Sequence, residues 1–148
     1  MRKLFSIALL FVIIGVSAQV YNPVKWKTSV TKVSADEYDL IATAIIEKGW
    51  HLYSQSVPAG GPVPTKFTFK SNPSYLKKGN TMEDKGTVVE DRIFEMKIKY
   101  FSNKAVFKQR IKVKSNPGFQ VKSDVEFMAC DDTKCLPPKV EALVFQVK

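Results

Sequence analysis

The chain has 148 residues and a formal net charge of +9, with 23 Lys and Arg against 14 Asp and Glu. It is long enough to bury a core as one domain, which excludes a small scaffold that depends on disulfides. With two cysteines and one histidine, a tetrahedral zinc site would have to recruit carboxylates. We expect no metal and no cofactor.

The first residues have the pattern of a secretory signal peptide. Residues 1–3 form a short basic region, and residues 4–16 form an apolar run. Val16-Ser17-Ala18 then provides the small residues of a cleavage site. The apolar run is too short for a comfortable membrane span. We therefore expect residues 1–18 to be removed and residues 19–148 to form one periplasmic domain without a membrane span, where disulfides persist. Export also argues against nucleic acid as a partner for the basic charge.

The chain after the leader is predicted to form strands. Residues 24–31 alternate with Trp26 on the inner face, residues 38–46 are apolar on both faces as in a central strand, and residues 50–53 follow a turn. The Pro- and Gly-rich stretch 54–64 predicts a loop, and residues 63–69 alternate again. We expect residues 71–80 to be a loop with one helical turn around Tyr75. His51 is expected to be structural or solvated.

The second half continues the same pattern. Residues 94–100 and 107–113 alternate on either side of a turn at 102–104, which predicts a hairpin. Residues 121–129 and 140–147 predict a second pair of strands. In total about eight strands without a helical period indicate an all-β fold, an immunoglobulin-like antiparallel β-sandwich.

Both cysteines lie between the last two strands. If the first of these strands continues to its end, Cys130 lies on the polar face, where a partner could reach it. A bridge to Cys135 closes a loop of about six residues and would contribute only ~2 kcal/mol, so it would be a weak staple. A short exposed loop suits thiol–disulfide exchange. The residues alone do not decide whether the two cysteines are a redox-active pair or a structural disulfide.

Local charge distinguishes the two sulfurs. Asp131 and Asp132 follow Cys130 and disfavour its thiolate, whereas Lys134 precedes Cys135 and favours one. We therefore expect Cys135 to exchange with a partner and Cys130 to resolve the mixed disulfide. Two prolines behind Cys135 are expected to keep the following segment stiff.

The run Ala129-Cys130 to Cys135-Leu136-Pro137-Pro138 resembles the active-site segment of the amino-terminal periplasmic domain of the thiol:disulfide interchange protein DsbD, the disulfide bond corrector domain family. Residues 49–53 resemble an early strand of that family. The resemblance implies an immunoglobulin-like fold and a mixed disulfide made by the cysteine before the Pro-Pro pair, which is Cys135. It also implies a cap loop carrying an aromatic, by position at 82–87, where this chain has none, and Leu136 stands where the family often has Tyr.

Two functions follow from these patterns. In the first, the domain is a thiol:disulfide oxidoreductase that relays electrons through Cys130 and Cys135. The resemblance gives its partners as thioredoxin-like redox proteins and periplasmic disulfide or cytochrome-maturation proteins. In the second, the domain is an immunoglobulin-like binding or adaptor module whose disulfide only stiffens a loop.

Overall fold

The computed structural model describes residues 21–148, and the predicted signal peptide lies outside these residues. The described chain forms strands throughout, and it contains no helix long and apolar enough to cross a membrane. The strands are β1 (Val24–Lys32), β2 (Glu37–Ile46), β3 (His51–Tyr53), β4 (Lys66–Phe69), β5 (Tyr75–Glu83), β6 (Thr87–Asp91), β7 (Met96–Ser102), β8 (Lys104–Val113), β9 (Phe119–Phe127), β10 (Ala129–Cys130) and β11 (Lys139–Val147).

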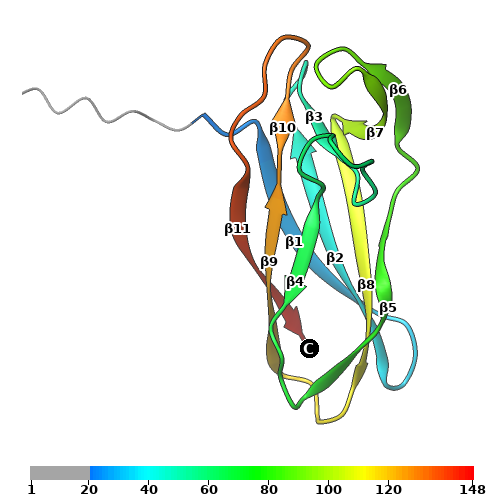
Figure 1. Cartoon of the computed structure of the whole chain (residues 1–148). Coiled ribbons are helices and arrows are strands. Elements are labelled where there is room, and N and C mark those ends of the chain that lie inside the picture. The colour runs from blue at the N-terminus through cyan, green and yellow to red at the C-terminus, as the bar shows by residue number, and fades with distance from the viewer. Residues whose placement is uncertain (1–20) are drawn as a thin grey trace, which may run out of the picture.

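The strands form three antiparallel sheets, in the orders β1-β2-β8-β5, β10-β3-β7-β6 and β11-β9-β4 (Figure 1). β2 lies between β1 and β8, so it is the central strand that its sequence predicted, although only one of its faces is fully buried. β9 pairs along its whole length with β11, as the alternation predicted. The prediction of an immunoglobulin-like antiparallel sandwich is confirmed.

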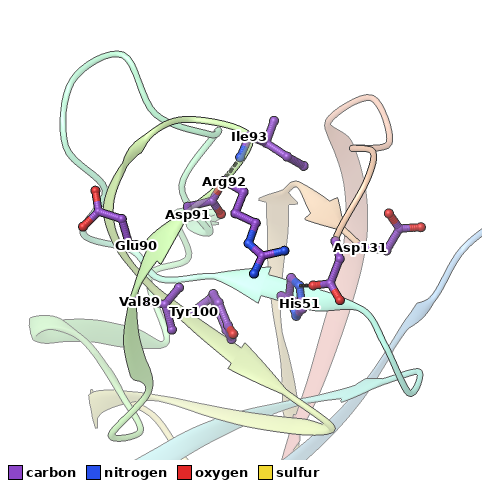
Figure 2. Close-up of a pocket in the computed structure, with 9 residues that line it drawn as sticks. His51, Val89, Glu90, Asp91, Arg92, Ile93, Tyr100 and Asp131 are labelled. Atoms are coloured by element: carbon purple, nitrogen blue, oxygen red, sulfur yellow. Dashed lines mark hydrogen bonds and ion pairs between the residues drawn. The ribbon is translucent and has the colours of Figure 1, made fainter.

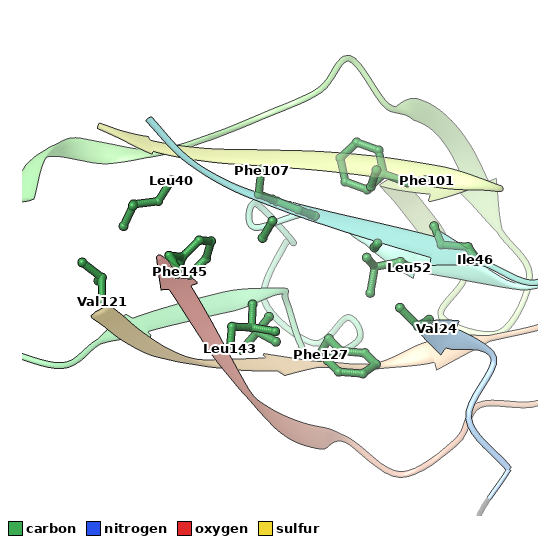
Figure 3. Close-up of a cluster of buried hydrophobic side chains, with 14 of the residues drawn as sticks. Val24, Leu40, Ile46, Leu52, Phe101, Phe107, Val121, Phe127, Leu143 and Phe145 are labelled. Carbon is green, nitrogen blue, oxygen red and sulfur yellow. The ribbon is translucent and has the colours of Figure 1, made fainter. Parts of the chain in front are cut away.

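The main core lies between the layers and is rich in aromatic side chains (Figure 3). Trp26 of β1 faces inward, as predicted, and its ring centroid lies 5.6–5.8 Å from those of Phe67, Phe107 and Phe127. These four rings come from β1, β4, β8 and β9, so they join strands of two different sheets. Such contacts add to the stabilisation from burial alone.

The prediction of a loop with a helical turn at 71–80 was wrong, because β5 begins at Tyr75. This strand is at an edge of its sheet, pairs only with β8, and has a register shift between Lys78 and Met82. Its middle residues are exposed, so polar residues occur on both faces and the alternation that marks a half-buried strand is missing.

The predicted hairpin of residues 94–100 with 107–113 was also wrong. β7 and β8 follow each other in the chain but belong to different sheets. Asn103 between them has a φ of 63°, a left-handed conformation that asparagine tolerates well, and its carbonyl accepts a hydrogen bond from Ile46. The two strands meet instead through the core, where the rings of Phe101 and Phe107 are 5.6 Å apart.

Candidate functional site

The two cysteines lie at the mouth of the β9–β11 hairpin and form a disulfide. After Phe127 the chain leaves this hairpin, and β10 pairs with β3 of the neighbouring sheet, with Cys130 directly opposite His51. The loop that follows β10 lies at the same end of the molecule as β3 and β6 (Figure 1). The disulfide therefore links Cys130, at the edge of the β10-β3-β7-β6 sheet, to Cys135, in the loop that leads into β11 of the β9–β11 hairpin.

Asp131 organises the loop between the cysteines. Its Oδ1 atom accepts hydrogen bonds from the backbone N–H groups of Thr133 and Lys134 and from the Thr133 hydroxyl, each at 2.8 Å. Its own N–H donates to the Lys134 carbonyl at 2.9 Å. The bond from the Thr133 backbone is the main cause that lowers the pKa of the Asp131 carboxyl below its ordinary value. The cysteine loop is therefore a closed turn with its own side-chain cap.

The two sulfur-bearing residues differ in exposure. Cys130 is 0% exposed, whereas Cys135 is only half-buried. The prediction that Cys130 lies on an accessible face was wrong. The strand does not run straight to its end, because the chain changes sheets after Met128, and at β10 the outer face of the sheet is covered. Access from solvent is thus restricted to Cys135.

A second, smaller apolar cluster surrounds the disulfide on that outer face; we call it the sulfur cluster. Its fully buried members are Tyr53, Ile98 and Cys130, and the half-buried side chains packed against it are Val57, Phe94, Met96, Tyr100, Met128 and Cys135. The cluster is separate from the main core, so the disulfide belongs to a local layer of the protein rather than to the centre of the sandwich.

The turn at residues 92–95, between β6 and β7, forms part of this cover. Asp91 holds it, because its Oδ1 atom accepts the N–H groups of Ile93 at 2.9 Å and Phe94 at 3.1 Å, while Oδ2 accepts the Tyr53 hydroxyl at 3.0 Å. Burial, together with the hydrogen bond to Asp91, raises the pKa of Tyr53 far above its ordinary value. Tyr53 therefore remains a neutral donor that fastens the turn over the sulfur cluster.

The position of this cover differs from the expectation. The family resemblance placed a cap loop at 82–87, whereas an aromatic side chain is provided by Phe94 of the 92–95 turn. Residues 82–87 end β5 and pass closely over β7: a Cβ atom at Gly86 would lie 2.7 Å from the Tyr100 carbonyl oxygen. Only glycine fits there without a shift.

Glu83 fixes the loop 54–64, which carries Val57 onto the sulfur cluster. Its carboxylate accepts the Ser54 hydroxyl at 2.5 Å, the Gln55 backbone N–H at 2.9 Å and the Lys99 ammonium at 2.8 Å. Burial alone would raise the pKa of Glu83, but the hydrogen bonds from Gln55, Lys99 and Ser54 outweigh it and lower the pKa. The carboxylate therefore stays charged where it ties β5, β7 and the loop together.

His51, which was expected to be structural or solvated, lies beside the disulfide, opposite Cys130. It lines a polar cleft of about 240 Å³ between the cysteine loop and the end of β6 (Figure 2). Its ring stacks on Tyr100 with centroids 4.4 Å apart, and Nε2 lies 3.3 Å from Oδ1 of Asp132. The pairing of β3 with β10, which one sequence does not show, brings it there.

Comparison with protein families identifies the chain. The family described as "Thiol:disulfide interchange protein DsbD, N-terminal" matches residues 21–146. The chain belongs to this family. No protein among the curated sequences compared with the chain is a match.

Two solved structures share the fold. The reduced N-terminal domain of DsbD from Neisseria meningitidis is 18% identical with a TM-score of 0.51, covering 82% of this chain and 84% of that one. The N-terminal periplasmic domain of ScsB from Proteus mirabilis is 14% identical with a TM-score of 0.56, and the match covers 82% of this chain but only 44% of that one. Membership of the DsbD N-terminal family, with a Cys130–Cys135 disulfide, supports thiol–disulfide exchange.

An apolar groove is lined by the segment that follows Cys135 in the DsbD-type domain. It has a volume of about 190 Å³ and contains the stiff Pro137-Pro138 segment next to Cys135. Its other lining residues are Tyr21, Asn22, Pro23, Phe127, Ala129, Leu136 and Lys139. Leu136 stands in its wall, so the position where the family often has Tyr is filled here by an aliphatic side chain.

Three features of this site escaped the sequence reasoning. For Asp131 the signal was present, because an Asp followed two residues later by Thr is a common turn former. For Phe94 and His51 no local signal existed, since their places depend on which strands become neighbours in space. The charge argument that favours a Cys135 thiolate stays a prediction.

Proposed function

We propose that this protein is an exported thiol:disulfide interchange domain in which Cys130 and Cys135 cycle between disulfide and dithiol. It would pass electrons from a thioredoxin-like donor to periplasmic thiol proteins, after loss of the signal peptide 1–18. The observation that carries the proposal is the asymmetry of the pair: a half-buried Cys135 is bonded to a fully buried Cys130 in a capped loop at the rim of the sandwich.

The asymmetry supports a particular order of steps. A thiolate of the donor attacks Sγ of Cys135, the exposed end of the bond, and Cys130 leaves with the electron pair of the broken sulfur–sulfur bond. A second thiolate of the donor then attacks the mixed disulfide, so the donor leaves oxidised and both cysteines of this protein are reduced. Transfer to an acceptor disulfide follows the same path in reverse, with Cys135 as the attacking thiolate.

The surroundings of Cys135 support a protein as the partner. The groove beside it is mainly apolar and stiffened by the two prolines, which suits contact with a folded surface. Thioredoxin-like proteins present a cysteine at their surface and are the partners that the family resemblance implies. Periplasmic disulfide and cytochrome-maturation proteins are the proposed acceptors.

Trapping of mixed disulfides tests the proposal. A Cys130→Ser variant lacks the resolving thiol, so covalent complexes with thioredoxin-like proteins through Cys135 should accumulate and be released by reductant. The matched Cys135→Ser variant should fold equally well and form no such complex. Absence of any covalent partner with Cys130→Ser, under conditions where its thiol reacts with iodoacetamide, contradicts the proposal.

Redox titration provides an independent test. The purified protein equilibrated in glutathione or thioredoxin buffers should show a reduction potential within the biological range. A potential below roughly −300 mV would mark a structural disulfide. In that case the adaptor function remains, and partner binding should be unchanged by Cys135→Ser.

A further inference from the structure

One ring nitrogen of His51 is buried and has no hydrogen-bond partner among residues 21–148. The other nitrogen, Nε2, lies 3.3 Å from Oδ1 of Asp132. Because a carboxylate can only accept a hydrogen bond, Nε2 carries the proton in this pair, and in the neutral ring Nδ1 is then an acceptor. Buried polar atoms in folded proteins nearly always have a partner, so an unpaired Nδ1 requires an explanation.

Cys130 is placed to be the missing donor. It is the residue directly opposite His51 in the β3–β10 pairing. Directly opposite residues of an antiparallel pair project from the same face of the sheet, with Cβ atoms about 5 Å apart. In the disulfide, the Cys130 sulfur carries no hydrogen. In the dithiol it gains an S–H group, which can donate to an acceptor nitrogen.

The burial of Cys130 creates a need for such a group. When the disulfide opens, the electron pair of the bond goes to a sulfur that is 0% exposed and surrounded by the apolar sulfur cluster. A thiolate in such surroundings is disfavoured, since burial penalises the charged form. A proton delivered to this sulfur removes the penalty, and His51 lies beside it at the border between the cluster and the polar cleft.

We propose that His51 carries the proton of Cys130 during disulfide exchange, and that Asp132 positions its ring. The proposal rests on the proposed function and adds the proton step to it. As the partner thiolate attacks Cys135, the leaving Cys130 sulfur takes a proton from the His51 imidazolium, and the ring becomes neutral. In the return step the Cys130 thiol gives its proton back to Nδ1, and the resulting thiolate attacks Cys135 and expels the partner as a thiolate. The ring exchanges protons with water through the open cleft.

Other charged groups also line the cleft. The Arg92 guanidinium extends toward His51 in Figure 2. Tyr100 stacks on the ring and limits its rotation. The titratable groups that line the cleft with His51 are Asp131 and Asp132 of the cysteine loop, Glu90, Asp91 and Arg92 at the end of β6, and Tyr100 of β7. The Glu90 carboxylate points away from His51 in Figure 2.

The test is the pH dependence of disulfide reduction by dithiothreitol between about pH 5 and 8, the range in which histidine ordinarily changes charge. Each rate constant is divided by the thiolate fraction of the reductant, so an uncatalysed reaction gives a flat profile. In the wild-type protein the corrected rate constant should fall as the pH rises. With His51→Gln the profile should be flat, and at the acid end the rate should be about a hundredfold lower, the lower end of general-acid effects.

Two further variants separate this role from a structural one. Asp132→Ala removes the hydrogen-bond acceptor of Nε2 at a side chain that is 85% exposed, so the fold is preserved, and it should weaken the slope of the profile. Glu90→Gln removes a negative charge from the same cleft without removing a hydrogen bond to the ring, and it should leave the slope unchanged. This pair of variants decides the question even if His51→Gln does not fold.

The outcomes distinguish the proton step from the redox function itself. A wild-type slope retained in His51→Gln, or a rate lowered equally at every pH, overturns the role of His51 while the exchange function stands. An unchanged slope in Asp132→Ala overturns the positioning role of Asp132. A wild-type disulfide that resists dithiothreitol at every pH contradicts the proposed function instead.

Discussion

At the scale of single residues, Asp131 sets the geometry of the cysteine loop. One carboxylate oxygen accepts three hydrogen bonds from the two residues that precede Cys135. Asp132, its neighbour in the chain, points instead toward His51 and makes no contact with the loop backbone among the hydrogen bonds of the described residues. The two acidic side chains, which have the same charge, therefore serve different purposes: one shapes the loop and the other faces the cleft.

Replacing Asp131 by Ala should loosen the loop. The N–H groups of Thr133 and Lys134 lose their acceptor, and their hydrogen exchange should become about tenfold faster because local opening is easier. NMR-detected hydrogen exchange measures this. Asp132→Ala, which removes the same charge without touching these N–H groups, is the matched control. Equal exchange in both variants would contradict the assignment.

The same interaction should depend on pH. The folded protein lowers the pKa of Asp131, so its contribution is present above the ordinary aspartate value of about 3.9 and is lost as the pH falls through the lower folded-state pKa. Protection of the Lys134 N–H, corrected for intrinsic exchange, should therefore decrease in strong acid in the wild-type protein. Asp131→Ala should show no such step.

Tyr53 is expected to matter through its hydroxyl. Tyr53→Phe leaves Oδ2 of the buried Asp91 without its donor, so the free energy of unfolding should fall by about 1–3 kcal/mol. The raised pKa of Tyr53 means that its contribution is complete below about pH 10, the ordinary tyrosine value, and is lost as the pH rises through the folded-state pKa. Urea unfolding at neutral and alkaline pH measures both effects. Equal stability of the two proteins at pH 7 would rule out this role.

At the scale of elements, the 92–95 turn determines how much of the sulfur cluster is open. Phe94 packs against the cluster, and its ring makes an edge contact with Tyr53 at 6.1 Å between centroids. The Asp91 side chain bonds both to the turn backbone and to Tyr53, and Asp91 pairs with Met96 across the turn.

Truncating Phe94 should expose the disulfide. We expect Phe94→Ala to be reduced by dithiothreitol roughly tenfold faster than the wild-type protein, since access to the sulfur limits the exchange rate. Stopped-flow reduction measures this. Val88→Ala is the matched control, because Val88 lies on β6 of the same hairpin and is 64% exposed. Identical rates for Phe94→Ala and the control would show that the turn does not shield the pair.

Elements also show what the sequence could and could not predict. Alternation marked β1, β4, β8, β9 and β11, whose more buried side chains lie on one face. It also marked β7, although β7 contributes Ile98 to the sulfur cluster and Phe101 to the main core. It could not tell that β7 and β8 enter different sheets, since two strands with the same alternation look alike whether or not they pair. The edge strand β5 was missed because its middle residues face solvent on both sides.

At the scale of the whole molecule, the protein has two separate apolar clusters, one between the sheets and one around the disulfide. The main core holds the sheets together through side chains of β1, β2, β8, β9 and β11, and the sulfur cluster lies outside it. The sequence was enough to select Cys130 and Cys135 as the candidate site and to place them at the mouth of a hairpin. Their unequal burial was not, because it results from the switch of the chain between sheets at Met128 and from segments distant in sequence.

Removal of the disulfide should therefore leave the fold intact. The double replacement Cys130→Ala and Cys135→Ala should lower the free energy of unfolding by at most about 2 kcal/mol, because the bridge closes a very short loop. Denaturant unfolding and far-UV circular dichroism measure stability and fold. A variant that is unfolded at 25 °C would indicate a structural bridge and favour the adaptor function.

The backbone around the cysteines has a consequence for how long a partner stays attached. The Leu136 N–H donates to the Ala129 carbonyl at 2.9 Å, and the Asp131 N–H to the Lys134 carbonyl, so the chain is clamped on both sides of the pair. These clamps do not depend on the sulfur–sulfur bond. The free thiol of Cys130 would then face a mixed disulfide at Cys135 with an effective molarity far above that of any dissolved thiol. We expect covalent encounters to be brief, so that turnover is governed by collision with the next partner rather than by escape from the last.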